Sequence, residues 1–106
     1  MQHSERCFNA LGDPTRRMIF ERLAARPLPV VEIARGLTVT RPAVSQHLKV
    51  LVSAGLAKRH VEGTRHYYGV DSRGVESMRD YLDQFWGGAL AAFKRAAETS
   101  PREGRR

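Results

Sequence analysis

Apolar side chains recur at helical spacing in the first quarter of the chain. We predict a short helix over His3–Leu11, because its apolar residues gather on one side. Gly12 interrupts this pattern. A second helix is predicted over Thr15–Ala25, with Asp13 as its N-cap and Pro14 at the first helical position, where the missing N–H of proline is not needed.

Two more helices follow, separated by a tight turn. The segment Val30–Gly36 has apolar residues at the spacing of one helical face and is predicted to be short. We expect the next helix over Arg41–Ala54, with Thr40 as its N-cap. Gly55 and Leu56 then supply the left-handed residue and the apolar contact that commonly end a helix.

From residue 57 the period of the pattern changes to two, which is typical of strands. The segments Ala57–Glu62 and Arg65–Val70 each alternate and are joined through Gly63 and Thr64, so they predict a β-hairpin. A long helix is expected from Asp71–Ser72 to about Glu98. Its apolar stripe comprises Val75, Met78, Leu82, Phe85, Trp86, Ala89, Leu90 and Phe93. We predict one domain over residues 1–98 and a disordered basic tail over residues 99–106, which has no apolar anchor.

The helix predicted over Arg41–Ala54 has two different faces. At about 100° per residue, Val44, Leu48 and Leu51 fall on one side. The opposite side holds Pro42 together with Ser45, Gln46, Lys49 and Ser53, whose side chains supply hydrogen-bonding groups and a positive charge. A helix of this kind after a short helix and a tight turn is typical of the recognition helix in a helix-turn-helix. With the hairpin as a wing, the predicted fold class is mainly α with a small β-hairpin, a winged helix-turn-helix.

The charge of the chain favours a nucleic-acid partner. Its 106 residues carry 18 Lys and Arg against 11 Asp and Glu, a formal net charge of +7, and the pI is about 10.5. A basic surface that serves only solubility is the alternative. The predicted hairpin concentrates donors at Lys58, Arg59, His60, Arg65 and His66, where a wing would meet the DNA backbone or the minor groove. We therefore predict binding to double-stranded DNA.

Several other function classes find no support in the sequence. No apolar run is long enough to span a membrane, and no secretory signal follows Met1. The single cysteine, Cys7, excludes an internal disulfide and fits a reducing compartment, so we expect a cytoplasmic location. No nucleophile motif, phosphate-cradling loop or paired-carboxylate site is recognisable, so we expect no enzyme and no cofactor.

Three segments carry a resemblance to a known family. The strings Leu11–Arg17, Thr40–Leu51 and Ala54–Leu56 resemble the ArsR family of bacterial winged-helix repressors. The segment Phe85–Phe93 is similar to the tail helix of a metal-independent branch of that family. The resemblance implies a homodimeric transcriptional repressor that binds an inverted-repeat operator, often at its own promoter.

The metal sites of that family have no counterpart in this chain. One family site uses a Cys-x-Cys pair, where this sequence has Val30–Ala34. Another uses histidines on the C-terminal helix, which has none here from Asp71 onward. We therefore predict no metal site. A remaining alternative is sensing of a metal or an oxidant through Cys7, which shares a helical face with His3.

The residues with a predicted function fall into two sets. The predicted DNA-binding residues are Thr40, Arg41, Pro42, Ser45, Gln46, Lys49, Arg59, Arg65 and His66. The terminal helices are expected to form the homodimer interface, because a small winged domain has little interior to hide their apolar surface. The predicted interface residues are Phe8, Leu11, Leu82, Phe85, Trp86, Leu90 and Phe93. A winged helix used for protein–protein interaction instead of DNA binding is the second alternative.

Overall fold

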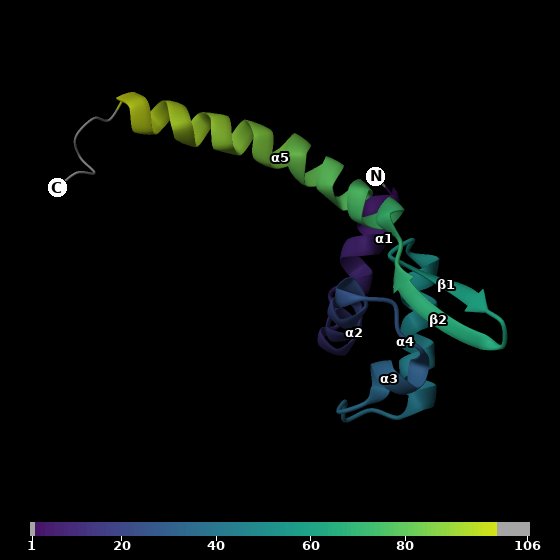
Figure 1. Cartoon of the computed structure of the whole chain (residues 1–106). Coiled ribbons are helices and arrows are strands. Elements are labelled where there is room, and N and C mark those ends of the chain that lie inside the picture. The colour runs from purple at the N-terminus through teal and green to yellow at the C-terminus, as the bar shows by residue number, and fades with distance from the viewer. Residues whose placement is uncertain (1, 100–106) are drawn as a thin grey trace.

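The computed structural model describes residues 2–99, except for the side chains of Gln2 and Phe85. Helices and a single hairpin follow one another along the chain (Figure 1). The elements are α1 (Gln2–Ala10), α2 (Pro14–Ala25), α3 (Val30–Ala34), α4 (Arg41–Ser53), β1 (Ala57–Glu62), β2 (Arg65–Val70) and α5 (Ser72–Thr99). This order and the antiparallel pairing of β1 with β2 confirm the predicted winged helix-turn-helix.

The two predicted helix N-caps are confirmed by their hydrogen bonds. An Asp13 carboxylate oxygen accepts from the backbone N–H of Thr15 at 2.9 Å and of Arg16 at 3.1 Å. The hydroxyl of Thr40 accepts from the backbone N–H of Ala43 at 3.2 Å. Each cap satisfies N–H groups that have no partner within the helix, so both helices begin next to the cap residue.

The predicted ends of the helices differ from the observed ones by one or two residues. α1 begins and ends one residue early, and α3 stops at Ala34 instead of Gly36. Arg35 has an extended backbone with a ψ of 125°, and Gly36 follows with a φ of 81°, so the chain leaves the helix directly after Ala34. α4 ends at Ser53, where Gly55 adopts a φ of 79°. This left-handed glycine is the predicted stop signal.

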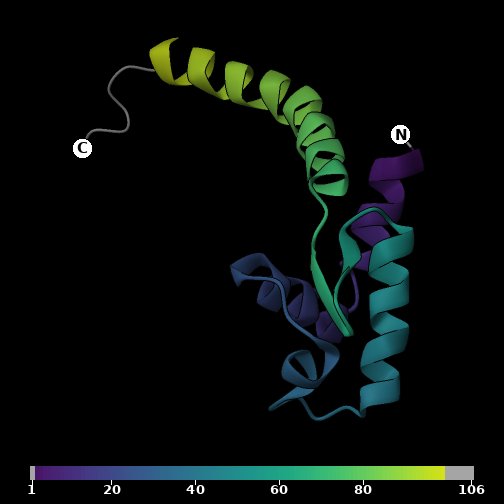
Figure 2. The same ribbon diagram turned by 45° about the vertical axis from the view of Figure 1, so that its right-hand side comes forward.

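A single apolar core joins α1, α2, α3, α4 and the start of the hairpin. The predicted inner face of α4, formed by Val44, Leu48 and Leu51, is at most 1% exposed. Its neighbours in the core include Ile19 of α2 and Ile33 of α3. Figure 2 shows α4 standing beside the hairpin and α1. Because the core holds one side of α4, the other side is fixed toward solvent.

The hairpin is tied back to the helical part of the molecule. β1 and β2 pair from Ala57 opposite Val70 to Glu62 opposite Arg65. Tyr68 also exchanges two backbone hydrogen bonds, of 2.8 and 2.9 Å, with Leu28 in the segment before α3. The base of the wing is therefore held at a defined position, while its tip extends from the body.

Helix α5 leaves the body of the molecule and gives it a longest dimension of 62 Å (Figure 1). Thr99, predicted as the first residue of the tail, is the last residue of this helix. The rest of the predicted tail, residues 100–106, lies outside the described residues. Within residues 2–99, no helix combines the length and the apolar character that crossing a membrane requires.

Candidate DNA-binding surface

The outer face of α4 carries the predicted reading residues. Ser45, Gln46 and Lys49 are all exposed, on the side of the helix opposite to the buried face. Short polar groups and one cation therefore project from a helix whose backbone is fixed by its apolar side. Such a helix can present hydrogen-bond donors and acceptors to base edges.

The N-terminal turn of α4 adds three exposed residues. Thr40, Arg41 and Pro42 lie where the helix begins. The hydroxyl of Thr40 is engaged in capping, which leaves Arg41 as the cation at this end. The partial positive charge of the helix N-terminus adds to that of Arg41, so this end of the helix is suited to an anion.

The predicted wing residues are exposed on the hairpin. Arg59 lies on β1, and Arg65 and His66 begin β2. The Arg65 guanidinium donates to the Tyr67 hydroxyl at 3.2 Å, and this hydrogen bond raises the pKa of Arg65. The side chain is thus oriented along the strand and stays charged.

The wing and α4 enclose an open cleft of about 410 Å³, which we call the wing cleft. It is lined by Lys49, Val52, Ser53, Arg59 and Tyr68. The structure thus brings together two predicted residues, Lys49 of α4 and Arg59 of β1. Two cations and two hydroxyl groups around one cleft suit a phosphate group.

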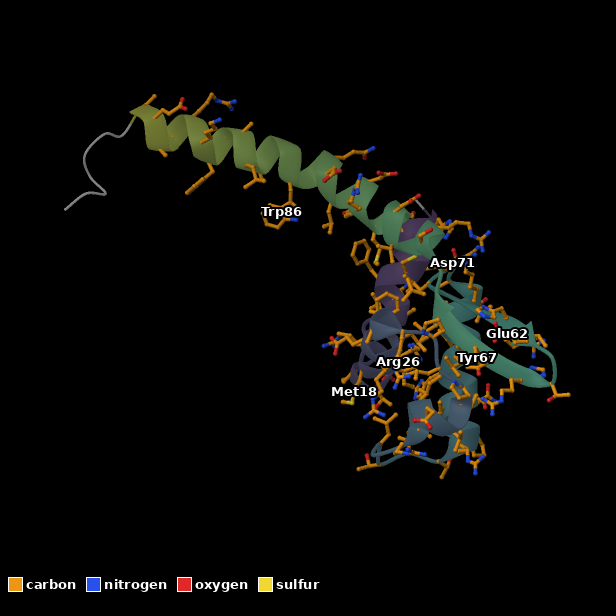
Figure 3. The ribbon with its side chains drawn as sticks, in the orientation of Figure 1. Met18, Arg26, Glu62, Tyr67, Asp71 and Trp86 are labelled. Atoms are coloured by element: carbon orange, nitrogen blue, oxygen red, sulfur yellow. The ribbon has the colours of Figure 1, made fainter. Side chains whose placement is uncertain are left out.

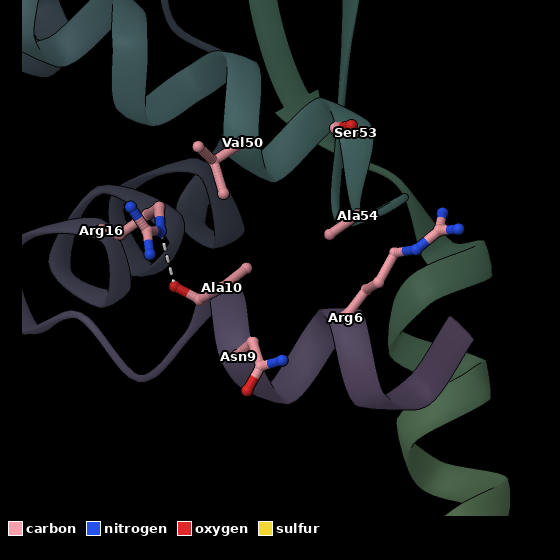
Figure 4. A pocket seen from close by; sticks show the side chains of 7 residues that line it. All are labelled: Arg6, Asn9, Ala10, Arg16, Val50, Ser53 and Ala54. Carbon is pink, nitrogen blue, oxygen red and sulfur yellow. Dashed lines mark hydrogen bonds between the residues drawn. The ribbon is translucent and has the colours of Figure 1, made fainter. Parts of the chain in front are cut away.

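A second open cleft, of about 240 Å³, lies on α4 where the helix meets α1; we call it the α1 cleft (Figure 4). It is lined by Arg6, Asn9, Ala10, Arg16, Val50, Ser53 and Ala54. The Arg16 Nε donates to the Ala10 carbonyl at 2.7 Å, and its Nη1 lies 3.3 Å from Nδ1 of His47. Arg16 is therefore fixed between α1 and α4.

Sequence reasoning missed Arg6, Asn9 and Arg16 as residues of the surface beside α4. The string from Asp13 to Arg17 marked the family, but no pattern in it indicates that Arg16 contacts His47 of the recognition helix. The contact joins residues 31 positions apart. Only the packing of α1 and α2 against α4 brings them together.

Most of the predicted interface residues form an exposed apolar surface. Phe8 of α1 meets Tyr81 of α5 edge to face, with ring centroids 5.6 Å apart. Along α5 the exposure is 47% for Trp86 and 71% for Phe93. Figure 3 shows Trp86 projecting from the side of α5.

The other predicted interface residues are placed as follows. Leu82 and Leu90 are exposed, 37% and 59% respectively. Leu11 is half-buried and packs against the core, so only part of it reaches the surface. The side chain of Phe85 lies outside what the structure describes.

Cys7 is fully buried. Its Sγ donates to the Ala54 carbonyl at 3.2 Å and lies 3.6 Å from the Gly74 carbonyl. Burial also raises the pKa of the thiol, which disfavours the reactive thiolate. His3, its suggested partner, is exposed. Cys7 therefore acts as a packing residue where α1, α4 and α5 meet.

The fold and this surface define the chain as a winged helix-turn-helix protein, and comparisons with known proteins agree. A family model described as a helix-turn-helix domain matches residues 11–60. The HTH-type transcriptional regulator Rv2034 of Mycobacterium tuberculosis is 52% identical over 89 residues, which cover 84% of this chain and 83% of the relative. The chain belongs to the ArsR family of helix-turn-helix transcriptional regulators, which are DNA-binding proteins and not enzymes.

Two solved structures show the same architecture. An ArsR-like transcriptional regulator from Rhodococcus sp. RHA1 has a TM-score of 0.74 and 27% identity, with 91% of this chain and 93% of that chain covered. The homodimeric winged helix-turn-helix DNA-binding domain of Mb0332 from Mycobacterium bovis, a possible ArsR-family regulator, has a TM-score of 0.63 and 26% identity, with coverages of 89% and 84%.

Proposed function

We propose that this regulator is a homodimeric repressor that occupies an inverted-repeat operator, including one at its own promoter. The observation that carries the proposal is the polar outer face of α4, held toward solvent by a fully buried inner face and flanked by a basic wing. Repression then follows from occupation of promoter DNA and needs no chemical step. We also propose that residues 1–98 act as one domain for binding and dimerisation.

Within this proposal the two parts of the surface have different tasks. Ser45, Gln46 and Lys49 face the major groove, where Gln46 has the amide geometry that reads adenine. Lys49 and Arg41 bind guanine or phosphate. The wing contacts phosphate or the minor groove through Arg59, Arg65 and His66. The exposure of all these side chains, and the cleft that Lys49 and Arg59 share, support this division.

The proposed dimer forms through α1 and α5. Exposed large apolar side chains run from Phe8 and Tyr81 to Phe93, and a row of such side chains on a surface marks an interaction site. The Mycobacterium bovis relative is homodimeric, which supports the same state here. A twofold dimer presents two copies of α4 about 34 Å apart, one turn of B-DNA, and therefore requires a palindromic site.

We further propose that the protein belongs to a branch that works without a metal ion. In the part of the chain that the structure describes, no three His, Cys, Asp or Glu side chains come close enough to hold one. The buried thiol of Cys7 argues against the alternative of thiol sensing, because an oxidant or a metal would have to enter the core to reach it.

Fluorescence anisotropy tests the proposal. The labelled probe is the DNA upstream of the gene for this protein, compared with scrambled DNA across a salt series, with and without zinc and a thiol oxidant. We expect affinity for the upstream DNA to exceed that for scrambled DNA by at least about 10³. Equal and salt-sensitive binding to both DNAs would contradict the proposal and favour a protein-interaction module. A loss of affinity on adding zinc or oxidant would contradict the metal-independent branch.

Two variants distinguish a residue that reads a base from a residue that contacts the DNA backbone. Gln46→Ala should relax the preference at one base pair and leave the salt dependence unchanged. Arg65→Gln should weaken binding to all sequences and reduce the slope of log K against log salt by about one. Arg26→Gln, an equal loss of charge at an exposed position after α2, is the control. An unchanged slope for Arg65→Gln would remove this residue from the contacts.

A further inference from the structure

Basic clefts lie on both sides of α4. The wing cleft joins α4 to β1, and the α1 cleft joins α4 to α1 and the start of α2. Ser53 lines both clefts, so the outer face of α4 forms the ridge between them. The proposed function uses the ridge and the wing side, but gives no task to the cations on the α1 side.

The polar side chains that line the α1 cleft include two cations and no carboxylate, and they surround an apolar surface. Arg6 and Asn9 come from α1 and Arg16 from α2, while the floor is formed by small apolar groups. Figure 4 shows Arg6 and Arg16 on opposite sides of Ala10. Among the described residues, Arg6 takes part in no ion pair. An oxyanion is the ligand that such a set of donors fits.

Arg16 is already in place for such a ligand. Its hydrogen bond to the Ala10 carbonyl and its contact with His47 fix the guanidinium before anything binds. A fixed side chain loses little conformational entropy on binding, so the cleft is preorganised.

The shape of DNA indicates where the oxyanion comes from. The major groove is about 12 Å wide, which is close to the diameter of a helix with its side chains, so a recognition helix has a phosphate backbone on each side. The wing cleft faces one backbone. We infer that the α1 cleft binds a phosphate of the other strand through Arg6, Asn9 and Arg16. This inference rests on the proposed function, because it assumes that α4 enters the groove.

Replacing Arg6 provides the first test, because this exposed side chain forms no ion pair with the described residues. In anisotropy titrations over a salt series, Arg6→Gln should reduce the slope of log K against log salt by about one. The base preference tested through Gln46 should stay unchanged. Arg26→Gln, the matched charge control, should leave the slope as in the wild type. An equal slope for Arg6→Gln and Arg26→Gln would overturn the inference.

Single neutral methylphosphonate linkages in the probe locate the partner phosphate. For the wild type, one linkage on the strand opposite to the wing contacts should weaken binding several-fold, and Arg6→Gln should abolish that penalty. A penalty that persists undiminished in Arg6→Gln at every linkage would contradict the inference. Scrambled DNA has the same phosphates, so the loss of slope should appear there too. Absence of an operator preference would therefore contradict only the proposed function. An unchanged salt slope for Arg6→Gln would contradict only this inference.

A free anion is the other possible source of the phosphate group. The thermal melting of the DNA-free protein is measured with inorganic phosphate and with chloride at equal ionic strength. We expect equal melting temperatures, because one open cleft holds a free anion weakly. Stabilisation by phosphate that Arg6→Gln removes, together with an unchanged salt slope on DNA, would assign the cleft to a free oxyanion and overturn the assignment to the DNA backbone.

Discussion

The two halves of α5 have the same amphipathic pattern but different surroundings. In the first half, Val75 and Met78 pack on the core, and the Gly74 N–H bonds to the Gly55 carbonyl at 2.8 Å. In the second half, Leu90 and Phe93 continue the stripe at 59% and 71% exposure. The apolar stripe continues along the whole helix, but only its first half packs against the rest of the same chain.

The two halves of α5 show what a helical pattern does and does not predict. Periodic apolar residues predict a helix with one face to bury, but they do not say which molecule buries it. The first half of α5 packs on α1 and on the turn after α4, where the Gly55 and Leu56 carbonyls accept from the backbone N–H groups of Gly74 and Asp71. In our account, the second half finds its partner in another copy of the chain.

The largest expected effect comes from the exposed half. Phe93→Glu places a charge in the proposed interface, and the two copies together should weaken dimerisation by about 4 kcal/mol, the transfer free energy of two phenylalanine side chains. Sedimentation equilibrium measures the dissociation constant. The control is Ala91→Glu, which adds the same charge on the opposite side of α5 and should leave the dimer intact. A dimer equally strong in both variants would show that this stripe is not the interface.

A smaller loss is expected at the buried half, and it concerns the fold itself. A Cβ at position 74 would clash with the carbonyl oxygen of Gly55, a backbone atom that cannot swing away as a side chain could. Gly74→Ala should lower the free energy of unfolding by about 3 kcal/mol in urea titrations. Nothing lies within 4 Å of a Cβ at Gly87, so Gly87→Ala should change the free energy of unfolding by no more than about 1 kcal/mol. Equal losses of unfolding free energy for Gly74→Ala and Gly87→Ala would contradict the difference between the two halves of α5.

The smallest expected effect compares two ion pairs, that of Asp71 with Arg73 where α5 begins and that of Arg79 with Asp83 within the helix. Asp71 is buried, and hydrogen bonds from Arg73 lower its pKa from 3.8 to about 2. The ionised carboxylate therefore stabilises the fold above about pH 4, and this contribution is lost as pH falls toward 2. Since the Arg73 side chain is 76% exposed, we expect only about 1 kcal/mol.

Asp71→Asn isolates the charge, because an Asn side-chain oxygen can still accept from the Arg73 backbone N–H, which bonds to Asp71 Oδ1 at 3.0 Å. The variant should be less stable than the wild type at pH 7, and the difference should shrink as the pH approaches 2 in urea titrations. Asp83→Asn is the control, because Asp83 and Arg79 are both exposed and 3.9 Å apart. A difference for Asp71→Asn that does not depend on pH would rule out the charge as its cause.

Local chemistry explains why much of the fold was predictable. Asp13 and Thr40 cap the helices that they precede in sequence, and Gly55 stops α4 through its own backbone conformation. The two strands were predicted to the residue, because alternation and a two-residue turn fix the pairing. The helix ends that were missed, such as that of α3, depend on hydrogen bonds of a single turn.

The candidate site was predictable only where it lies on one element. The outer face of α4 follows from a helical wheel, so Gln46 and Lys49 could be named in advance. The α1 cleft could not, because Arg6, Arg16 and Val50 come from three helices and meet only after packing. The burial of Cys7 likewise depends on α5 closing over it, which no local pattern shows.

The central claim is that two copies of this chain read one operator. Sedimentation of a fluorescent duplex carrying the upstream DNA measures the mass of protein bound to it. The account predicts two chains of 11.9 kDa on each duplex, bound in one cooperative step, and a half-site on its own should bind far more weakly. One chain per duplex, or binding that a half-site supports equally well, would contradict the dimeric repressor.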